Sequence, residues 1–228
     1  MALAPSLYAK LPYDPVRDFS PIINVAHVPY AIGLNPTVPA TSVKELVAIA
    51  RRKSNYLSYG SSGTGSISNL AAELFKSLAG AQIVHVPYKG TAPALADVVS
   101  GQIDMMFADL SLIQNLAGNG RLRLVAVTGS KRSPAARGVP TVMESGLKGY
   151  QIEPWFGLVA PAGVPRDIVV RLNGVIAAGL KAPDVTQRLD ALGYEPIGGT
   201  PEQFAATIRE DIPGYARIVK AAGIKADL

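Results

Sequence analysis

A glycine- and serine-rich segment, YGSSGTGS at residues 59–66, has the residue types that bind an anion. It joins a predicted strand to a predicted amphipathic helix, and a helix start presents unpaired backbone N–H groups and the positive end of the helix dipole. Hydroxyl groups add donors, while glycine lets the backbone approach a ligand closely. The segment predicts either an anion site or an ordinary capped turn. Its candidate ligand contacts are Ser61, Ser62, Thr64, Gly65 and Ser66.

A second segment, HVPYKGTAPA at residues 85–94, repeats this arrangement of strand, polar loop and helix. In an open α/β sheet, ligands bind at the carboxyl ends of the strands, so the two loops are expected at the same edge. The alternative is that Tyr88 packs in the core, Lys89 is solvated and Thr91 only caps the next helix. The candidate contacts here are Tyr88, Lys89, Gly90 and Thr91.

A third loop, FADLS at residues 107–111, contributes Ala108 and Asp109. Asp109 is expected either to hydrogen-bond a ligand or to cap the following helix. Ser62, His85 and Asp109 have the residue types of a catalytic triad, but GSSGTG is not a G-x-S-x-G elbow and His85 lies in a strand pattern. The first loop also has no lysine where a Walker loop requires one and misses the G-x-G-x-x-G spacing, so a nucleotide site is disfavoured. No enzyme activity is expected.

The elements that position these loops alternate between strand and helix. This pattern predicts an α/β fold with a largely parallel sheet and helices on its faces. Two further segments, 22–34 and 150–159, look extended and bracket the alternating part, and three helices finish the chain. We also expect a turn of helix at 141–144, and Pro213 should kink or divide the last helix.

Composition limits the remaining classes of function. The 228 residues include no cysteine and two histidines, without the spacing of a metal site, so no metal and no cofactor are expected. The net charge of +5 suits anionic metabolites, but the basic residues are scattered and predict no nucleic-acid partner. The first residues do not read as a secretory signal, so the chain as written would stay in the cytoplasm.

Several ordered segments together carry a resemblance to a known family. They include LYAKLPYDPVRDFSPI, YGSSGTGS, IVHVPYKGTAPAL, LRLVAVTGSKRSP and WFGLVAPAGVP. The chain resembles the Bug family of TctC-type receptors, which serve tripartite tricarboxylate transporters. The resemblance implies a type II periplasmic-binding-protein fold, a small organic carboxylate as ligand, membrane transporter subunits as partners and a periplasmic location. It places the family's cleft loops on the candidate residues named above.

The resemblance also shows two departures. Asn69 stands where members often carry histidine, and the opening segment of the family, which builds the first domain and half of the ligand cradle, has no counterpart here. We therefore expect residues 26–156 to form a complete α/β domain. Residues 1–25 and 157–228 would be the remnant of the other domain, mostly helices that have lost their sheet. Such exposed apolar faces predict self-association, as a homo-oligomer, or a remodelled C-terminal region, and weakened ligand binding.

The leading functional prediction is a solute-binding receptor for a small organic carboxylate, truncated at its N-terminus. The alternative is a cytoplasmic ligand-sensing or interaction fragment of the same fold with no role in transport. The sequence does not identify the carboxylate, because backbone donors recognise its charged head and leave the tail to the shape of the cavity.

Overall fold

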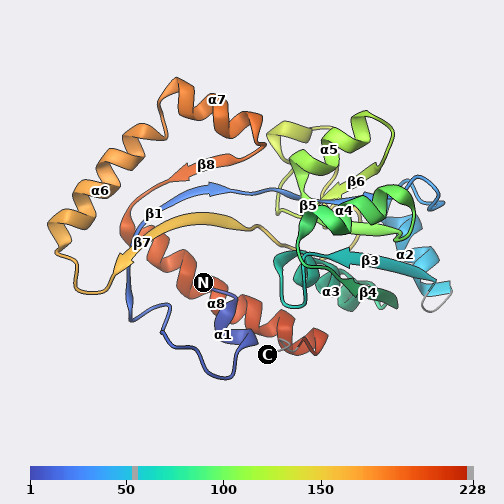
Figure 1. Cartoon of the computed structure of the whole chain (residues 1–228), viewed down its shortest axis with the longest axis horizontal. Helices are drawn as coiled ribbons and strands as arrows, with labels where there is room; N and C mark the ends of the chain where they lie inside the picture. The colour runs from blue at the N-terminus through green and yellow to red at the C-terminus, as the bar shows by residue number, and fades with distance from the viewer. Residues whose placement is uncertain (53–55, 225–228) are drawn as a thin grey trace. The chain divides into compact units, whose positions relative to one another are not determined.

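The chain forms two compact units in the computed structural model (Figure 1). The structure describes residues 1–52 and 56–224, so residues 53–55 and 225–228 of the predicted domains lie outside the described part. Unit 1 combines Met1–Val28 with the described chain from Trp155 onward, and unit 2 is Pro29–Pro154. The chain therefore passes twice between the units. That unit 1 is the remnant of a larger domain stays a prediction.

Five strands of unit 2 form one sheet in the order β4-β3-β5-β2-β6. β3 runs parallel to β4 and β5, whereas β2 pairs antiparallel with β5 and β6. In the described sheet, β2 therefore runs against the other four strands, and the prediction of a largely parallel sheet is confirmed for the alternating strands β3 to β6. The strands are β2 (Tyr30–Leu34), β3 (Leu57–Ser61), β4 (Ile83–Pro87), β5 (Met105–Asp109) and β6 (Arg123–Val127).

Helices cover both faces of this sheet. Phe107 of β5 contacts the ring of Phe75 in α3, with the ring centroids 5.8 Å apart. Met106 and Ala108 of β5 alternate to the other face and lie in an apolar cluster with residues of α4 and α5. The sheet therefore has apolar packing on both of its faces. The helices of unit 2 are α2 (Val43–Arg52), α3 (Ile67–Ala79), α4 (Thr91–Ser100), α5 (Leu110–Gly118) and the 3-10 helix η1 (Pro134–Ala136).

Unit 1 contains a three-stranded antiparallel sheet in the order β7-β1-β8. On β1, Ile22 and Ile23 are buried with Val169 of α6, and α8 also packs against β1. The expectation that these helices lack a sheet was therefore wrong. The strands are β1 (Phe19–His27), β7 (Trp155–Pro161) and β8 (Glu195–Gly198), and the helices are α1 (Ala4–Leu7), α6 (Arg166–Gly179), α7 (Pro183–Ala191) and α8 (Pro201–Ala222).

Residues 141–144 form a single turn, as predicted, but no longer helix follows. The N–H of Ser145 donates to the carbonyl of Thr141 (3.1 Å), and Thr141 and Glu144 exchange side-chain-to-backbone hydrogen bonds of 2.9 Å each, as in a capping box. α8 continues past Pro213, so the prediction that Pro213 divides the last helix was wrong, while a kink at Pro213 stays a prediction. Pro213 lies on the exposed side of the helix, where water can satisfy the carbonyl of Arg209 that loses its amide donor.

In the described residues, no helix combines the length and the apolar character needed to cross a bilayer.

Candidate functional site

The three predicted loops follow the carboxyl ends of β3, β4 and β5 (Figure 1). Since β3 is parallel to both of its neighbours, these ends lie at the same edge of the sheet. The N–H of Tyr88 donates to the carbonyl of Ser61 across a distance of 3.0 Å, which joins the first loop to the second. The structure therefore brings the predicted loops together at the edge where open α/β folds bind ligands.

Two serines of the first loop stabilise the loop itself. Ser66 is the N-cap of α3, and its Oγ accepts the N–H of Asn69 (3.3 Å) and donates to the carbonyl of Gly63 (2.6 Å). Ser61 is fully buried, accepts the N–H of Gly63 (3.2 Å) and bonds to Nε2 of His85 (2.7 Å). Both hydroxyls are thus engaged within the protein.

Ser68 and Asn69 are two buried residues of this loop region. Ser68 was not predicted as part of the site, and Asn69 was singled out only because members of the family often carry histidine there. Oγ of Ser68 accepts the N–H of Ser62 (2.9 Å), and Oδ1 of Asn69 accepts the N–H of Gly65 (3.0 Å). The signal was available, because both lie in the first helical turn after the N-cap, where side chains reach back to the preceding backbone. These two side chains therefore hold the backbone of the loop in place through hydrogen bonds.

Within the described residues, the N–H groups of this loop region that have no hydrogen-bond acceptor lie at or just before the start of α3. The N–H groups of Thr64, Ile67 and Ser68 donate to no other residue in the described part of the chain, nor does the hydroxyl of Thr64. Unpaired N–H groups of this kind carry the partial positive charge of the helix dipole. The first loop therefore offers a small cluster of backbone donors suited to one carboxylate group.

The second loop divides into a structural and an exposed part. The hydroxyl of Tyr88 donates to Asp97 of α4 (2.6 Å), and its ring packs against the apolar cluster below α4. Lys89 is exposed, Gly90 is the N-cap of α4 with a φ of 124°, and Thr91 is the first helical residue. Thr91 therefore does not occupy the N-cap, and the helix start faces the loop with backbone donors.

In the third loop, Ala108 is buried with its side chain in the core and pairs with Ala31 of β2. Any ligand contact of Ala108 would have to come from its backbone. Asp109 ends β5 at the N-cap position of α5, but its side chain makes no capping hydrogen bond. The alternative that Asp109 caps the helix was therefore wrong.

Nε2 of His85 bonds to Ser61, whereas Oγ of Ser62 bonds to Ser68, so these bonds do not join the residues of the hypothetical triad. The imidazole of His85 stacks on the ring of Tyr59, with centroids 4.8 Å apart and planes 13° from parallel. Among the described residues, no cluster of three metal-ligating side chains occurs.

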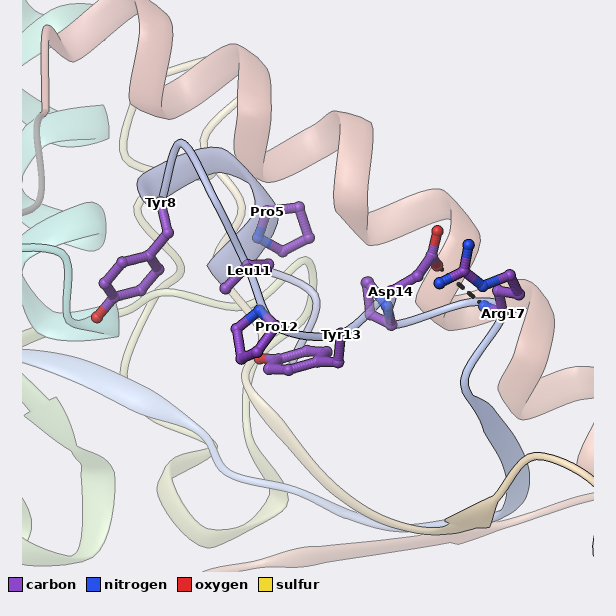
Figure 2. Close-up of a pocket in the computed structure, with 8 residues that line it drawn as sticks. Pro5, Tyr8, Leu11, Pro12, Tyr13, Asp14 and Arg17 are labelled. Carbon is purple, nitrogen blue, oxygen red and sulfur yellow. Dashed lines mark hydrogen bonds between the residues drawn. The ribbon is translucent and has the colours of Figure 1, made fainter.

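A separate cavity of about 380 Å³ lies along the N-terminal segment of unit 1, between tyrosines and prolines such as Tyr8 and Tyr13 (Figure 2). Its charged groups are engaged with one another. Asp14 accepts the N–H of Arg17 (2.9 Å), and the guanidinium of Arg17 pairs with Asp18 (2.7 Å). Backbone hydrogen bonds from Arg17 and Val16 lower the pKa of Asp14.

Tyr59 gives a stability prediction at alkaline pH. Burial, with the added effect of Glu73, raises the pKa of Tyr59 above its usual value near 10. Above that pH the unfolded tyrosine loses its proton while the folded one keeps it, so stability is present below pH 10 and is lost as pH rises. We expect a slope of up to about 1.4 kcal/mol per pH unit from this residue. Urea unfolding from pH 9 to 11 should show a smaller loss for Tyr59→Phe than for wild type.

Tyr8→Phe, at an exposed tyrosine, is the matched control. Equal alkaline slopes for Tyr59→Phe and wild type would contradict this prediction.

Comparison with known proteins agrees with this architecture. An adipate-bound structure of Rpa4515 from R. palustris is 38% identical, with a TM-score of 0.87, and the match covers 96% of this chain and 73% of that chain. MatC (Rpa3494) from Rhodopseudomonas palustris with bound malate is 30% identical, with a TM-score of 0.83 over 95% of this chain and 75% of that chain. The periplasmic binding protein BugD is 33% identical, with a TM-score of 0.85, over 98% and 76%.

Sequence relatives cover the chain to a similar extent. BugT of Bordetella pertussis (strain Tohama I) is 31% identical over 99% of this chain and 69% of that protein. A UPF0065 protein of Pseudomonas sp. (strain P51), from the tcbD-tcbE intergenic region, is 36% identical over 93% and 63%. The chain thus spans about two thirds of the length of these curated relatives.

The mixed sheet, its loop edge and these structural matches define the class of the protein as an α/β fold of the periplasmic-binding-protein type. The family follows from residues 1–224, which match the family described as tripartite tricarboxylate transporter family receptor. The chain belongs to that family. The family is one of receptors and not of enzymes.

Proposed function

We propose that this chain captures a small organic dicarboxylate and presents it to a transporter of the tripartite tricarboxylate type, in the periplasm. The observation that carries the proposal is the group of unpaired N–H groups at the start of α3, on Thr64, Ile67 and Ser68, beside the start of α4. Backbone donors at a helix start bind a carboxylate without requiring a cationic side chain.

The proposal of a dicarboxylate draws on the solved relatives. Adipate and malate are the ligands bound to two of them, and each acid carries two carboxylates. In this chain one carboxylate would bind at the start of α3. The start of α4, with the N-cap Gly90 and the exposed Lys89, is the candidate site for the second one or for a hydroxyl group.

A calorimetric screen of the whole chain tests this function. It uses acetate, malate, adipate and citrate at matched ionic strength and pH 7.5. We expect saturable binding of at least one dicarboxylate, with acetate at least tenfold weaker because a single head group makes only part of the contacts. Heats at the level of buffer dilution for all four acids would refute the proposal.

We further propose that unit 1 associates with a second copy of the chain. On α6, Ile168, Leu172 and Val175 are exposed at a spacing that places them on one side of the helix. β7 is an edge strand with exposed Phe156 and Leu158, and an edge strand can pair with its own copy about a two-fold axis.

Light scattering over a range of concentrations should show a dimer that Leu172→Glu with Val175→Glu converts to monomer. Ala178→Glu, at an exposed and already small residue of α6, is the control. A wild-type monomer at high concentration would count against the association.

A further inference from the structure

A continuous chain of hydrogen bonds lies behind the first loop of unit 2. At its inner end, Nζ of Lys76 pairs with Oε1 of Glu73 at 2.6 Å, and the hydroxyl of Tyr59 donates to the same oxygen at 2.6 Å. Nδ2 of Asn69 donates to the Tyr59 oxygen at 2.7 Å, and Oδ1 of Asn69 accepts the N–H of Gly65 at 3.0 Å. The loop is therefore connected through Asn69 to an ion pair on α3.

The chemistry of this chain allows only one orientation of the Asn69 amide. The Glu73 carboxylate only accepts, so Tyr59 must donate to it, and the Tyr59 oxygen must then accept from its other neighbour. The NH₂ group of Asn69 consequently faces Tyr59, and its carbonyl faces Gly65. A residue at position 69 has to be a donor on one side and an acceptor on the other.

The bond to Gly65 fixes the part of the loop that precedes the helix. Gly65 has a φ of 76°, a left-handed conformation that favours glycine, and its N–H is taken by Asn69. The same turn leaves the N–H groups of Thr64 and Ile67 unpaired within the described part of the chain. Asn69 is 2% exposed, so it acts through Gly65 and not by touching a ligand.

We propose that Asn69 is a positioning residue, which holds the turn before α3 in the shape that presents its free N–H groups to a carboxylate. This inference rests on the proposed function for the binding measurement, but the shape of the turn can be measured without a ligand. Loss of Asn69 should loosen the turn and weaken carboxylate binding about tenfold or more, since a buried donor and a buried acceptor both lose their partner.

Histidine provides a sharp test, because neutral imidazole has one donor and one acceptor and can replace both bonds of Asn69. Protonated imidazole has two donors and no acceptor for the N–H of Gly65. We expect Asn69→His to bind the dicarboxylate found in the screen within about threefold of wild type at pH 8. Its affinity relative to wild type should fall by up to tenfold per pH unit below the imidazole pKa.

The affinity ratio of variant to wild type, measured from pH 6 to 8, isolates this effect. The ionisable groups around position 69 are Tyr59 from β3, Glu73 and Lys76 from α3, and His85 from β4, whose ring stacks on Tyr59. All four are present in both proteins. Asn119→His, at an exposed residue after α5, controls for an added imidazole elsewhere.

Amide hydrogen exchange of Gly65 in the ligand-free protein completes the test. Asn69→Leu, which has a similar size and no polar atoms, should speed this exchange at least tenfold and weaken binding of the dicarboxylate. If wild type binds no acid, the proposed function fails, while the Gly65 exchange rate still decides the role of Asn69. Unchanged exchange in Asn69→Leu, or an Asn69→His ratio that does not vary with pH, would overturn the inference.

Discussion

Replacing Thr64 with aspartate should weaken carboxylate binding at least about 100-fold. Thr64 is half-buried in the loop before α3, and its hydroxyl bonds to no other described residue, so the substitution removes no internal contact. An aspartate would place a permanent negative charge beside the free N–H groups and occupy them. At about 5 Å and an effective dielectric constant of about 20, two carboxylates repel by about 3 kcal/mol, which corresponds to more than 100-fold in affinity.

Thr64→Asn is the matched control, because asparagine has the shape of aspartate without its charge. Calorimetry should place Thr64→Asn within about fivefold of wild type, a loss of about 1 kcal/mol. The effect of the aspartate should also shrink in high salt, since an exposed charge is screened. Equal affinities of the two variants would mean that the bound carboxylate lies away from this helix start.

Replacing Gly157 with valine should destabilise unit 1 by about 3 kcal/mol or more. Gly157 lies in β7 directly below Phe204 of α8, and a Cβ atom at Gly157 would come within 2.1 Å of the Phe204 ring. Phe204 cannot move freely, because it is 1% exposed and packs edge-on against Trp155 at a centroid distance of 4.9 Å. Nε1 of Trp155 also donates to Asp211 of α8 at 2.6 Å. A displaced Phe204 would therefore also disturb Trp155 and its hydrogen bond to α8.

Gly174→Ala provides the control for adding a side chain to a glycine of unit 1. Gly174 lies in α6, where a Cβ atom would meet no described atom within 4 Å, and alanine stabilises an exposed helix by about 0.5–1 kcal/mol. Thermal or urea unfolding should therefore shift in opposite directions for the two variants. A Gly157→Val protein as stable as wild type would show that α8 does not pack on β7 in this way.

The sequence was informative where local chemistry and periodicity agree. The strand before Gly60 and the helix after Ser66 were predicted because an apolar repeat begins directly after a residue suited to capping, and Ser66 is indeed the N-cap of α3. The same alternation predicted β4 and β5 and therefore the shared loop edge. These features depend on short-range interactions, which a sequence pattern records well.

Long-range pairing was predicted less well. β8 is four residues, EPIG, whose proline and glycine hide any alternation, and its pairing with β1 depends on residues about 170 positions away. β2 was joined to β1 in one extended segment, although the two strands belong to different sheets. Such partners are set by tertiary packing, which outweighs local propensity.

Within the site, the sequence predicted which loops come together better than it predicted which partners their side chains contact. Ser61 was expected to face a ligand, yet it is buried against His85, and Tyr88 turns its hydroxyl to Asp97. Ser68 was missed as part of the site, and the bond of Asn69 to Gly65 was not predicted, because a pattern does not show which hydroxyls and amides point back into a loop. Whether each predicted residue contacts a ligand stays a prediction.

If unpaired N–H groups at the start of α3 bind a carboxylate, a ¹H–¹⁵N correlation spectrum of the chain should report it during titration with malate or adipate. We expect saturable downfield shifts of the Thr64, Ile67 and Ser68 amides, with smaller changes at Gly65, whose N–H is already held by Asn69. Saturable binding that leaves these three amides unshifted and moves resonances elsewhere would contradict it.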